Sequence, residues 1–151
     1  MNVELADVMP YNKNNFGRTA AMKVFAELAS RGNTSILPVL IKGTRDKNQL
    51  VRYNATRGLE DLASMGEAKT MQGLIRGLIG KSGFVYGPAR GGLNALIQHK
   101  VPVIKHLAGL YGKLGDSLAR KRILAVIKDY ALKGDDEAKE FLMGLKIAYY
   151  K

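Results

Sequence analysis

A repeat of 34 residues is the feature that most constrains how this chain can fold. The segment Leu28-Ala29-Ser30-Arg31-Gly32-Asn33 matches Leu62-Ala63-Ser64-Met65-Gly66-Glu67, which begins 34 positions later. The same period aligns three apolar columns, one of which contains Phe25, Leu59, Leu93 and Ile127. Within each copy the apolar residues fall at i, i+4 and i+7, along one face of an α-helix. One such unit cannot bury its apolar face alone, so the copies are expected to stack around a common core.

A second apolar stripe precedes each of these helices, so each repeat predicts a pair of helices. The clearest examples of this stripe are Ile36, Leu37, Leu40 and Ile41 and, one repeat later, Met71, Leu74, Ile75 and Leu78. Segments rich in Gly, Asn, Asp and Ser separate the paired helices, and these residues break one helix and cap the next. Glycine recurs where the second helix should end, at Gly32, Gly66 and Gly134. Such glycines are typical of helix C-termini.

These patterns predict an all-α protein built as a short right-handed α-solenoid. About four stacked helical hairpins are expected, followed by a terminal capping helix. The whole chain, 1–151, is expected to form a single domain, since its length is close to the commonest domain size. The predicted repeats are approximately 1–33, 34–67, 68–101 and 102–135, with the capping helix at 136–151.

The second repeat resembles a known family. Residues 44–55 read Thr-Arg-Asp-Lys-Asn-Gln-Leu-Val-Arg-Tyr-Asn-Ala and are followed by Leu59, Leu62 and Gly66. This pattern resembles the HEAT repeat, in which a turn aspartate precedes Val-Arg, Ala, Leu and Leu of the second helix. The match is partial in the other repeats. The resemblance implies a scaffold that binds proteins chiefly and, in some members, DNA.

The resemblance also implies a structural role for one column of side chains. In HEAT proteins the arginine of the second helix pairs with the turn aspartate of its own or a neighbouring repeat, which here assigns Asp46 and Arg52 to a structural ladder. The column at this period consists of Arg18, Arg52, Tyr86 and Arg120. The residues six positions before its other three members are Asn12, Gly80 and Leu114, so the ladder is expected to be broken there. For Arg18 and Arg120, structural and binding roles both stay open.

The charge of the chain predicts the class of its partner. The formal net charge is +11, and residues 68–115 contain no Asp or Glu. That stretch contains the basic residues Lys69, Arg76, Lys81, Arg90, Lys100, Lys105 and Lys113. Because a basic surface concentrates polyanions, the expected partner is nucleic acid or a nucleoprotein, with an acidic protein as the alternative.

Three groups of residues are candidates for binding. Lys13, Lys47 and Lys81 are 34 positions apart in the predicted turns, beside the amino ends of second helices. Lysines and helix amino ends together suit phosphate oxygens, although turn lysines can also serve only solubility. A third group, Arg120-Lys121-Arg122, spans about 200° of a helix circumference, so at least one of its members must face solvent.

The second group lies in the third repeat, which departs from its sister repeats. Tyr86 replaces the arginine of the column, and Pro88 and several glycines weaken the helix, which predicts a late helix start. Gly87 and Gly91 would allow close approach of another backbone. Close helix packing is one interpretation of this segment, and a groove in which Tyr86 and Arg90 meet a ligand is the other.

No pattern in the sequence predicts catalysis, a cofactor or a metal. The chain has no cysteine, and neither His99 nor His106 has a carboxylate nearby in sequence to complete the three or four ligands of a metal site. Gly80-Lys81-Ser82 lacks the first glycine of the phosphate-binding loop motif and follows a predicted helix rather than a strand. We therefore expect a protein that is not an enzyme.

The sequence leaves three functions open. The first is a scaffold for a polyanion, the second an adaptor for an acidic peptide or helix, and the third a self-assembling subunit. Self-association would use the solenoid ends, and Ile147-Ala148-Tyr149-Tyr150 would either cap the chain's own stack or join another. The acidic N-terminal segment and the lack of an apolar run of about 18 residues predict a cytoplasmic protein that does not bind membranes.

Overall fold

The computed structural model describes residues 14–149, and every regular element in that range is a helix. The elements, in chain order, are α2 (Asn15–Ser30), η2 (Thr34–Ile36), α3 (Leu37–Gly43), α4 (Gln49–Ser64), η3 (Ala68–Thr70), α5 (Met71–Ile79), α6 (Gly83–Gln98), α7 (Val103–Tyr111), α8 (Ser117–Leu132) and α9 (Asp136–Tyr149). The predicted all-α class is therefore confirmed. Lys13 and the side chains of residues 147–150 lie outside the described part of the chain.

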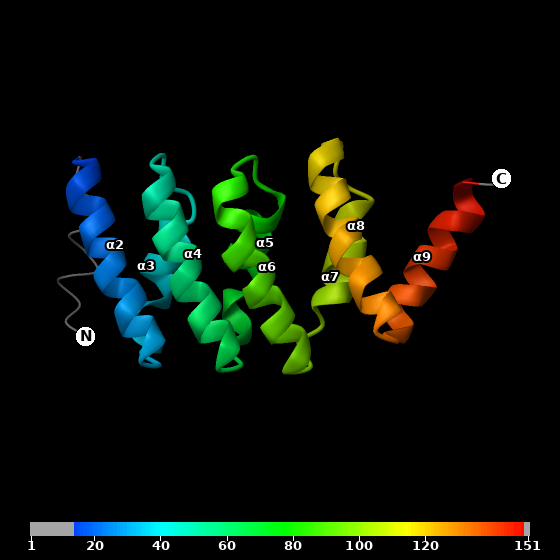
Figure 1. Cartoon of the computed structure of the whole chain (residues 1–151), viewed down its shortest axis with the longest axis horizontal. Coiled ribbons are helices and arrows are strands. Elements are labelled where there is room, and N and C mark those ends of the chain that lie inside the picture. Colours follow the sequence, from blue (N-terminus) through cyan, green and yellow to red (C-terminus); the bar gives the residue numbers. More distant parts are fainter. Residues whose placement is uncertain (1–13, 150–151) are drawn as a thin grey trace. The chain divides into compact units, whose positions relative to one another are not determined.

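The helices group into two compact units, Met1–Val101 and Pro102–Lys151. In the first unit α3 pairs with α4 and α5 pairs with α6, while α4 packs between α2 and α6 (Figure 1). In the second unit α8 packs against α7 and α9. One helical pair thus lies within each of the predicted repeats 34–67, 68–101 and 102–135. None of the described helices has the length and apolar character that crossing a membrane requires.

Local signals explain where the helices begin and end. Side-chain oxygens of Asn14, Asn48 and Asp116 accept backbone N–H groups in the first turns of α2, α4 and α8, at 2.9 Å in each case. These bonds satisfy amides that have no partner within the helix. Gly32, Gly66 and Gly134 follow α2, α4 and α8 with φ values of 84°, 89° and 98°. Lys100 takes the corresponding place after α6 with a φ of 67°.

The predicted apolar columns form the core. Phe25, Leu59, Leu93 and Ile127, one from each second helix, are all buried. The first helices contribute a matching buried row, which includes Ile36, Leu40, Leu74, Leu78, Ile104 and Leu107. Burial of a side chain of this size contributes about 1.5–3 kcal/mol, so these rows supply much of the stability of each unit.

Two glycines allow α4 to approach its neighbours closely in the first unit. A Cβ added to Gly58 of α4 would lie 2.9 Å from a methyl carbon of Leu40 and 3.3 Å from the Cα of Ala26. A Cβ added to Gly92 of α6 would lie 2.7 Å from a methyl carbon of Leu74 and 3.2 Å from the Cα of Glu60. Any larger residue at these positions must therefore displace a neighbour.

The course of α6 differs from the prediction in two respects. The helix is continuous from Gly83 to Gln98 with Pro88 inside it, so the expected late start is wrong. The proline costs the hydrogen bond that its missing N–H would form, but α6 packs against α4 and α5, and that packing maintains the helix. Nothing lies within 4 Å of a Cβ built on Gly87, and a Cβ built on Gly91 would meet the carboxylate of Glu60 rather than backbone.

We predict that alanine substitution destabilises the protein at one glycine of α6 and has little effect at another. Gly92→Ala should lower the free energy of unfolding by about 1–3 kcal/mol, because its methyl group overpacks the contact with Leu74 and α4. Gly83→Ala at the first position of the same helix has no neighbour within 4 Å and should change it by less than about 0.5 kcal/mol. Urea denaturation of the whole chain measures both, and equal effects would contradict the close packing at Gly92.

Candidate anion-binding cleft

A buried ion pair joins the first two repeats. The Nε of Arg18 in α2 lies 2.9 Å from Oδ2 of Asp46, and its Nη2 lies 3.1 Å from Oδ1. The same Nη2 donates to the side-chain oxygen of Asn15. The side chains of the pair are only 8% and 11% exposed, so this two-point contact is shielded from water.

The environment of Asp46 favours its charged form. Burial by itself raises the pKa of Asp46, but the hydrogen bonds from Arg18 and from the backbone N–H of Asn48, with the positive charges of Arg18 and Arg52, outweigh it. The net result is a pKa below the ordinary value. The N–H of Asn48 reaches Oδ1 at 2.8 Å. Asp46 therefore fixes the turn before α4 while it holds α2.

Arg52 contacts the backbone carbonyl of Asp46, whereas the predicted ladder implies a contact with the Asp46 carboxylate. Its Nη1 donates to the backbone carbonyl oxygens of Asp46 at 2.8 Å and Lys47 at 2.9 Å. The carboxylate of Asp46 is bound by Arg18 of the preceding repeat, which the sequence analysis left open between structure and binding. The arginine–aspartate pair thus joins the first repeat to the second. The guanidinium of Arg52 lies at the interface between the second and third repeats.

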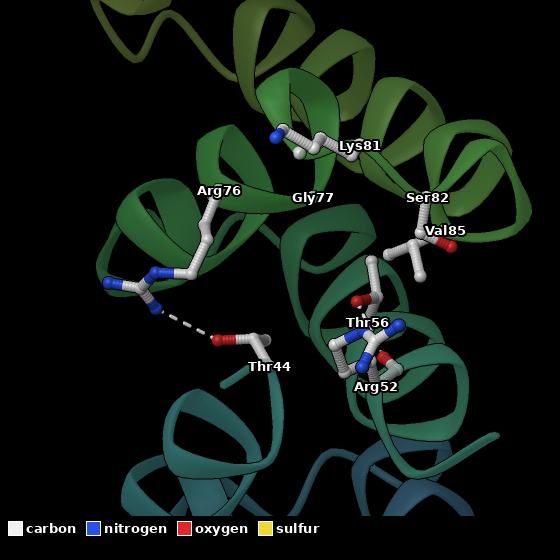
Figure 2. A pocket seen from close by; sticks show the side chains of 9 residues that line it. Thr44, Arg52, Thr56, Arg76, Gly77, Lys81, Ser82 and Val85 are labelled. Carbon is white, nitrogen blue, oxygen red and sulfur yellow. Dashed lines mark hydrogen bonds between the residues drawn. The ribbon is translucent and has the colours of Figure 1, made fainter. Parts of the chain in front are cut away.

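At that next interface lies a cleft of about 270 Å³. It is lined by Thr44, Arg52, Thr56, Arg76, Gly77, Gly80, Lys81, Ser82 and Val85. These residues come from the end of α3, from α4, from α5, and from the turn that leads into α6. Figure 2 shows Arg76 and Arg52 on opposite sides of the opening, with Lys81 on the α5–α6 turn.

The charge of the cleft is one-sided. Arg52, Arg76 and Lys81 are cationic, and none of the nine described residues that line it is acidic. The Nη1 of Arg76 donates to Oγ1 of Thr44 at 2.9 Å (Figure 2). Burial, and secondarily the positive charge of Arg45, lower the pKa of Arg76. A negatively charged group in this cleft would relieve the repulsion among its cations.

The structure brings only part of the predicted binding set together. Lys81 lines the cleft, Lys47 is exposed in the preceding turn, and Lys13 lies outside the described residues. Tyr86 and Arg90 are half-buried on α6, where Arg90 donates to the Tyr86 hydroxyl at 3.0 Å, and neither lines the cleft.

The third predicted group lies on α8 in the second unit. Arg120 and Lys121 are exposed, and Arg122 is half-buried, in line with the helical spacing. The guanidinium carbon of Arg120 lies 4.5 Å from the centre of the Tyr111 ring, a distance typical of a cation–π contact. Within its own unit, Arg120 is therefore partly occupied with a structural contact.

Two features of the surface were not predicted. Arg76 belongs to the acid-free stretch, but nothing in its local pattern indicates that it faces the same cleft as Arg52. The 34-residue period also places four exposed apolar residues at the second positions of α2, α4, α6 and α8. They are Phe16, Leu50, Phe84 and Leu118. The 34-residue spacing of these apolar residues is visible in the sequence, and they lie outside the three columns that form the buried face.

Comparison with known proteins supports the fold. No family model matches the sequence, and no curated protein does. Two crystal structures of engineered proteins each align with 95% of this chain at 20% identity, with TM-scores of 0.53 and 0.52. The alignments cover 68% of the first engineered chain and 41% of the second. A designed armadillo repeat protein aligns with 93% of this chain and 68% of its own, at 17% identity and a TM-score of 0.54. The chain thus has the fold of a helical-repeat solenoid.

We predict that the link between the repeats weakens in acid. Asp46→Asn should lower the free energy of unfolding by about 2 kcal/mol at pH 7, because Arg18 loses its buried charged partner. Since the folded-state pKa of Asp46 is lowered, its contribution is present above its unfolded pKa and is lost as the pH falls through the folded value. The difference in free energy of unfolding between wild type and Asp46→Asn should therefore disappear below about pH 4.

The control for this experiment is Asp129→Asn in α8. Asp129 pairs with Lys133 at 3.1 Å with both side chains more than a third exposed, so its loss should cost less than about 1 kcal/mol. Denaturation midpoints measured from pH 3 to 7 compare the two variants. If the difference in stability between wild type and Asp46→Asn does not change with pH, the charge of Asp46 is not the cause of the difference.

Proposed function

We propose that this protein is a non-enzymatic binding scaffold whose basic edge engages a polyanion, most simply nucleic acid or a nucleoprotein. The observation that carries this proposal is the cleft at the α4–α6 interface, which three cationic side chains line with no acidic residue among the described residues of its lining. In most protein surfaces, charges of both signs alternate. A concentration of one sign favours partners of the other sign and speeds their association.

The turns on either side of the cleft extend this basic edge. Lys47 precedes α4 and Lys81 precedes α6, and both side chains are exposed. In the first unit these turns lie along one edge, at the amino ends of adjacent helices (Figure 1). Helix amino ends favour phosphate oxygens, and lysines add attraction that does not depend on base sequence. The edge therefore suits a phosphate backbone.

We further propose that the repeats are of the HEAT type. Each complete pair consists of two α-helices, as HEAT repeats have, rather than the three helices of armadillo repeats. The Arg18–Asp46 pair joins an arginine of a second helix to the turn aspartate of the neighbouring repeat, one of the two pairings known in HEAT proteins, although the resemblance assigned the ladder to Asp46 and Arg52. Both observations support this assignment within the broader class of helical-repeat solenoids.

An adaptor for an acidic helix is the second candidate. Phe16, Leu50 and Phe84 are 86%, 46% and 49% exposed on the first turns of adjacent helices, next to the turn lysines. An amphipathic helix with apolar and acidic faces could contact both rows at once. The charge of the cleft favours the polyanion, because three cations line it with no acidic residue among the described lining residues.

The polyanion proposal predicts binding that depends steeply on salt. Single- and double-stranded oligonucleotides of DNA and RNA, measured by fluorescence anisotropy from about 50 to 300 mM salt, should bind with a log–log slope of several. Replacing Lys47 and Lys81 together by alanine should reduce that slope by about two, because each phosphate contact contributes about one.

Lys69 and Lys100 provide the matched control. Lys69 lies in η3 before α5 and Lys100 follows α6, so both are at the opposite end of this helical pair from Lys81. The variant in which Lys69 and Lys100 are both replaced by alanine loses the same two positive charges. Its salt slope for oligonucleotide binding should equal that of wild type. No binding at 50 mM salt, or equal loss in both double variants, would refute the basic-edge scaffold and leave the acidic-helix adaptor to be tested with amphipathic peptides.

A further inference from the structure

The 34-residue register relates the buried ion pair to the cleft. Arg52 occupies in the second repeat the position that Arg18 occupies in the first, and Gly80 corresponds to Asp46. The first interface between repeats therefore contains a carboxylate facing an arginine. The second contains an arginine facing a glycine, and the cleft lies there, with both residues in its lining.

The glycine at position 80 is not required by its backbone conformation. Gly80 has φ −68° and ψ 161°, an extended conformation that any residue adopts. A Cβ added there would have one tight neighbour, the carbonyl oxygen of Arg76 at 3.1 Å, which calls for a shift of a few tenths of an ångström. The missing carboxylate is one difference between this interface and the preceding one. Another is the length of the first helix, because α5 continues to Ile79 whereas α3 ends at Gly43.

The cations around the missing carboxylate are held in place by protein contacts. Two backbone carbonyls fix one nitrogen of the Arg52 guanidinium, and the Thr44 hydroxyl fixes one nitrogen of the Arg76 guanidinium. Each guanidinium has five N–H donors, so these bonds position it without using its full capacity. Lys81, which is exposed, adds a third positive charge from the turn. Such groups are ready to bind an oxyanion without much further loss of side-chain entropy.

We propose that this cleft is a phosphate-binding site in which Arg52, Arg76 and Lys81 bind one phosphate group. The phosphate would take the place that the Asp46 carboxylate takes at the interface between the first and second repeats. The inference deepens the proposed function and rests on it for the source of the phosphate, the backbone of a nucleic acid. Thr44 and Ser82 line the same cleft. The hydroxyl of Thr44 donates to the carbonyl oxygen of Ile41 and accepts from Arg76.

Size and charge suit a single phosphate group. The cleft volume of about 270 Å³ is below the range of roughly 300–1,000 Å³ that encloses drug-sized molecules, so it suits one group of a longer ligand. Two arginines can each bind phosphate oxygens through paired N–H donors. The negative charge of a backbone phosphodiester would also offset part of the positive charge of the cleft.

The test restores the missing carboxylate. Gly80→Asp places an acidic side chain beside Arg52, as Asp46 does beside Arg18, and should occupy the site from within the chain. Gly80→Asn has nearly the same shape without the charge. Gly144→Asp in α9 adds the same charge where a Cβ has no neighbour within 4 Å, and controls for net charge.

Oligonucleotide binding should be weakest in Gly80→Asp. Relative to Gly80→Asn we expect an affinity loss of about tenfold, as expected for loss of a charged hydrogen-bonded contact, and a salt slope lower by about one. Gly144→Asp should bind as wild type does. The thermal midpoint of Gly80→Asp should equal or exceed that of Gly80→Asn, which shows that the variant is folded with Arg52 paired.

The outcomes separate this inference from the proposed function. If wild type binds oligonucleotides and Gly80→Asp binds as tightly as Gly80→Asn, the scaffold stands and the phosphate site is refuted. If wild type binds no oligonucleotide, the scaffold fails, and titration with inorganic phosphate decides the site. Amide NMR shifts at residues 80–83 that Gly80→Asp abolishes would assign the site to a free phosphate, and their absence in wild type would refute it.

Discussion

The close stacking of α4 against its neighbours is the contact on which the rest of the first unit depends. Gly58 and Gly92 leave room for adjacent side chains and backbone, so α2, α4 and α6 lie side by side. Their amino ends are consequently brought to one edge (Figure 1). Without that approach Arg18 could not reach a turn of the next repeat, and Arg52 would not share a cleft with Arg76.

Two successive interfaces built on this stacking show different electrostatics. In one, burial penalises the charges of Arg18 and Asp46, but two hydrogen bonds and the mutual attraction of the pair compensate for it. In the other, burial lowers the pKa of Arg76 and no acidic residue among those described lies in the cleft to compensate. The first arrangement joins repeats, and the second leaves the positive charge on which the proposed phosphate site depends.

The sequence predicted the features that depend on local pattern. The period located the helical pairs and their buried faces, and the terminal glycines located three helix ends, because caps and amphipathic faces follow from neighbouring residues. It did not predict that Pro88 lies inside α6, since packing against α4 and α5 overrides the local cost. Nor did it predict that Asp46 binds Arg18 through its carboxylate and Arg52 through its carbonyl. That choice depends on distances between repeats, which also bring Arg76 to the cleft.

The extended backbone of Gly80 has a consequence for how such chains diversify. Because the backbone of Gly80 has a conformation that any residue adopts, an acidic residue there calls only for a shift of a few tenths of an ångström against the carbonyl oxygen of Arg76. A single codon change could then convert a structural joint into a recognition position, or the reverse. Repeat arrays of this kind could vary their ligands one interface at a time while every core column remains under the same selection for packing.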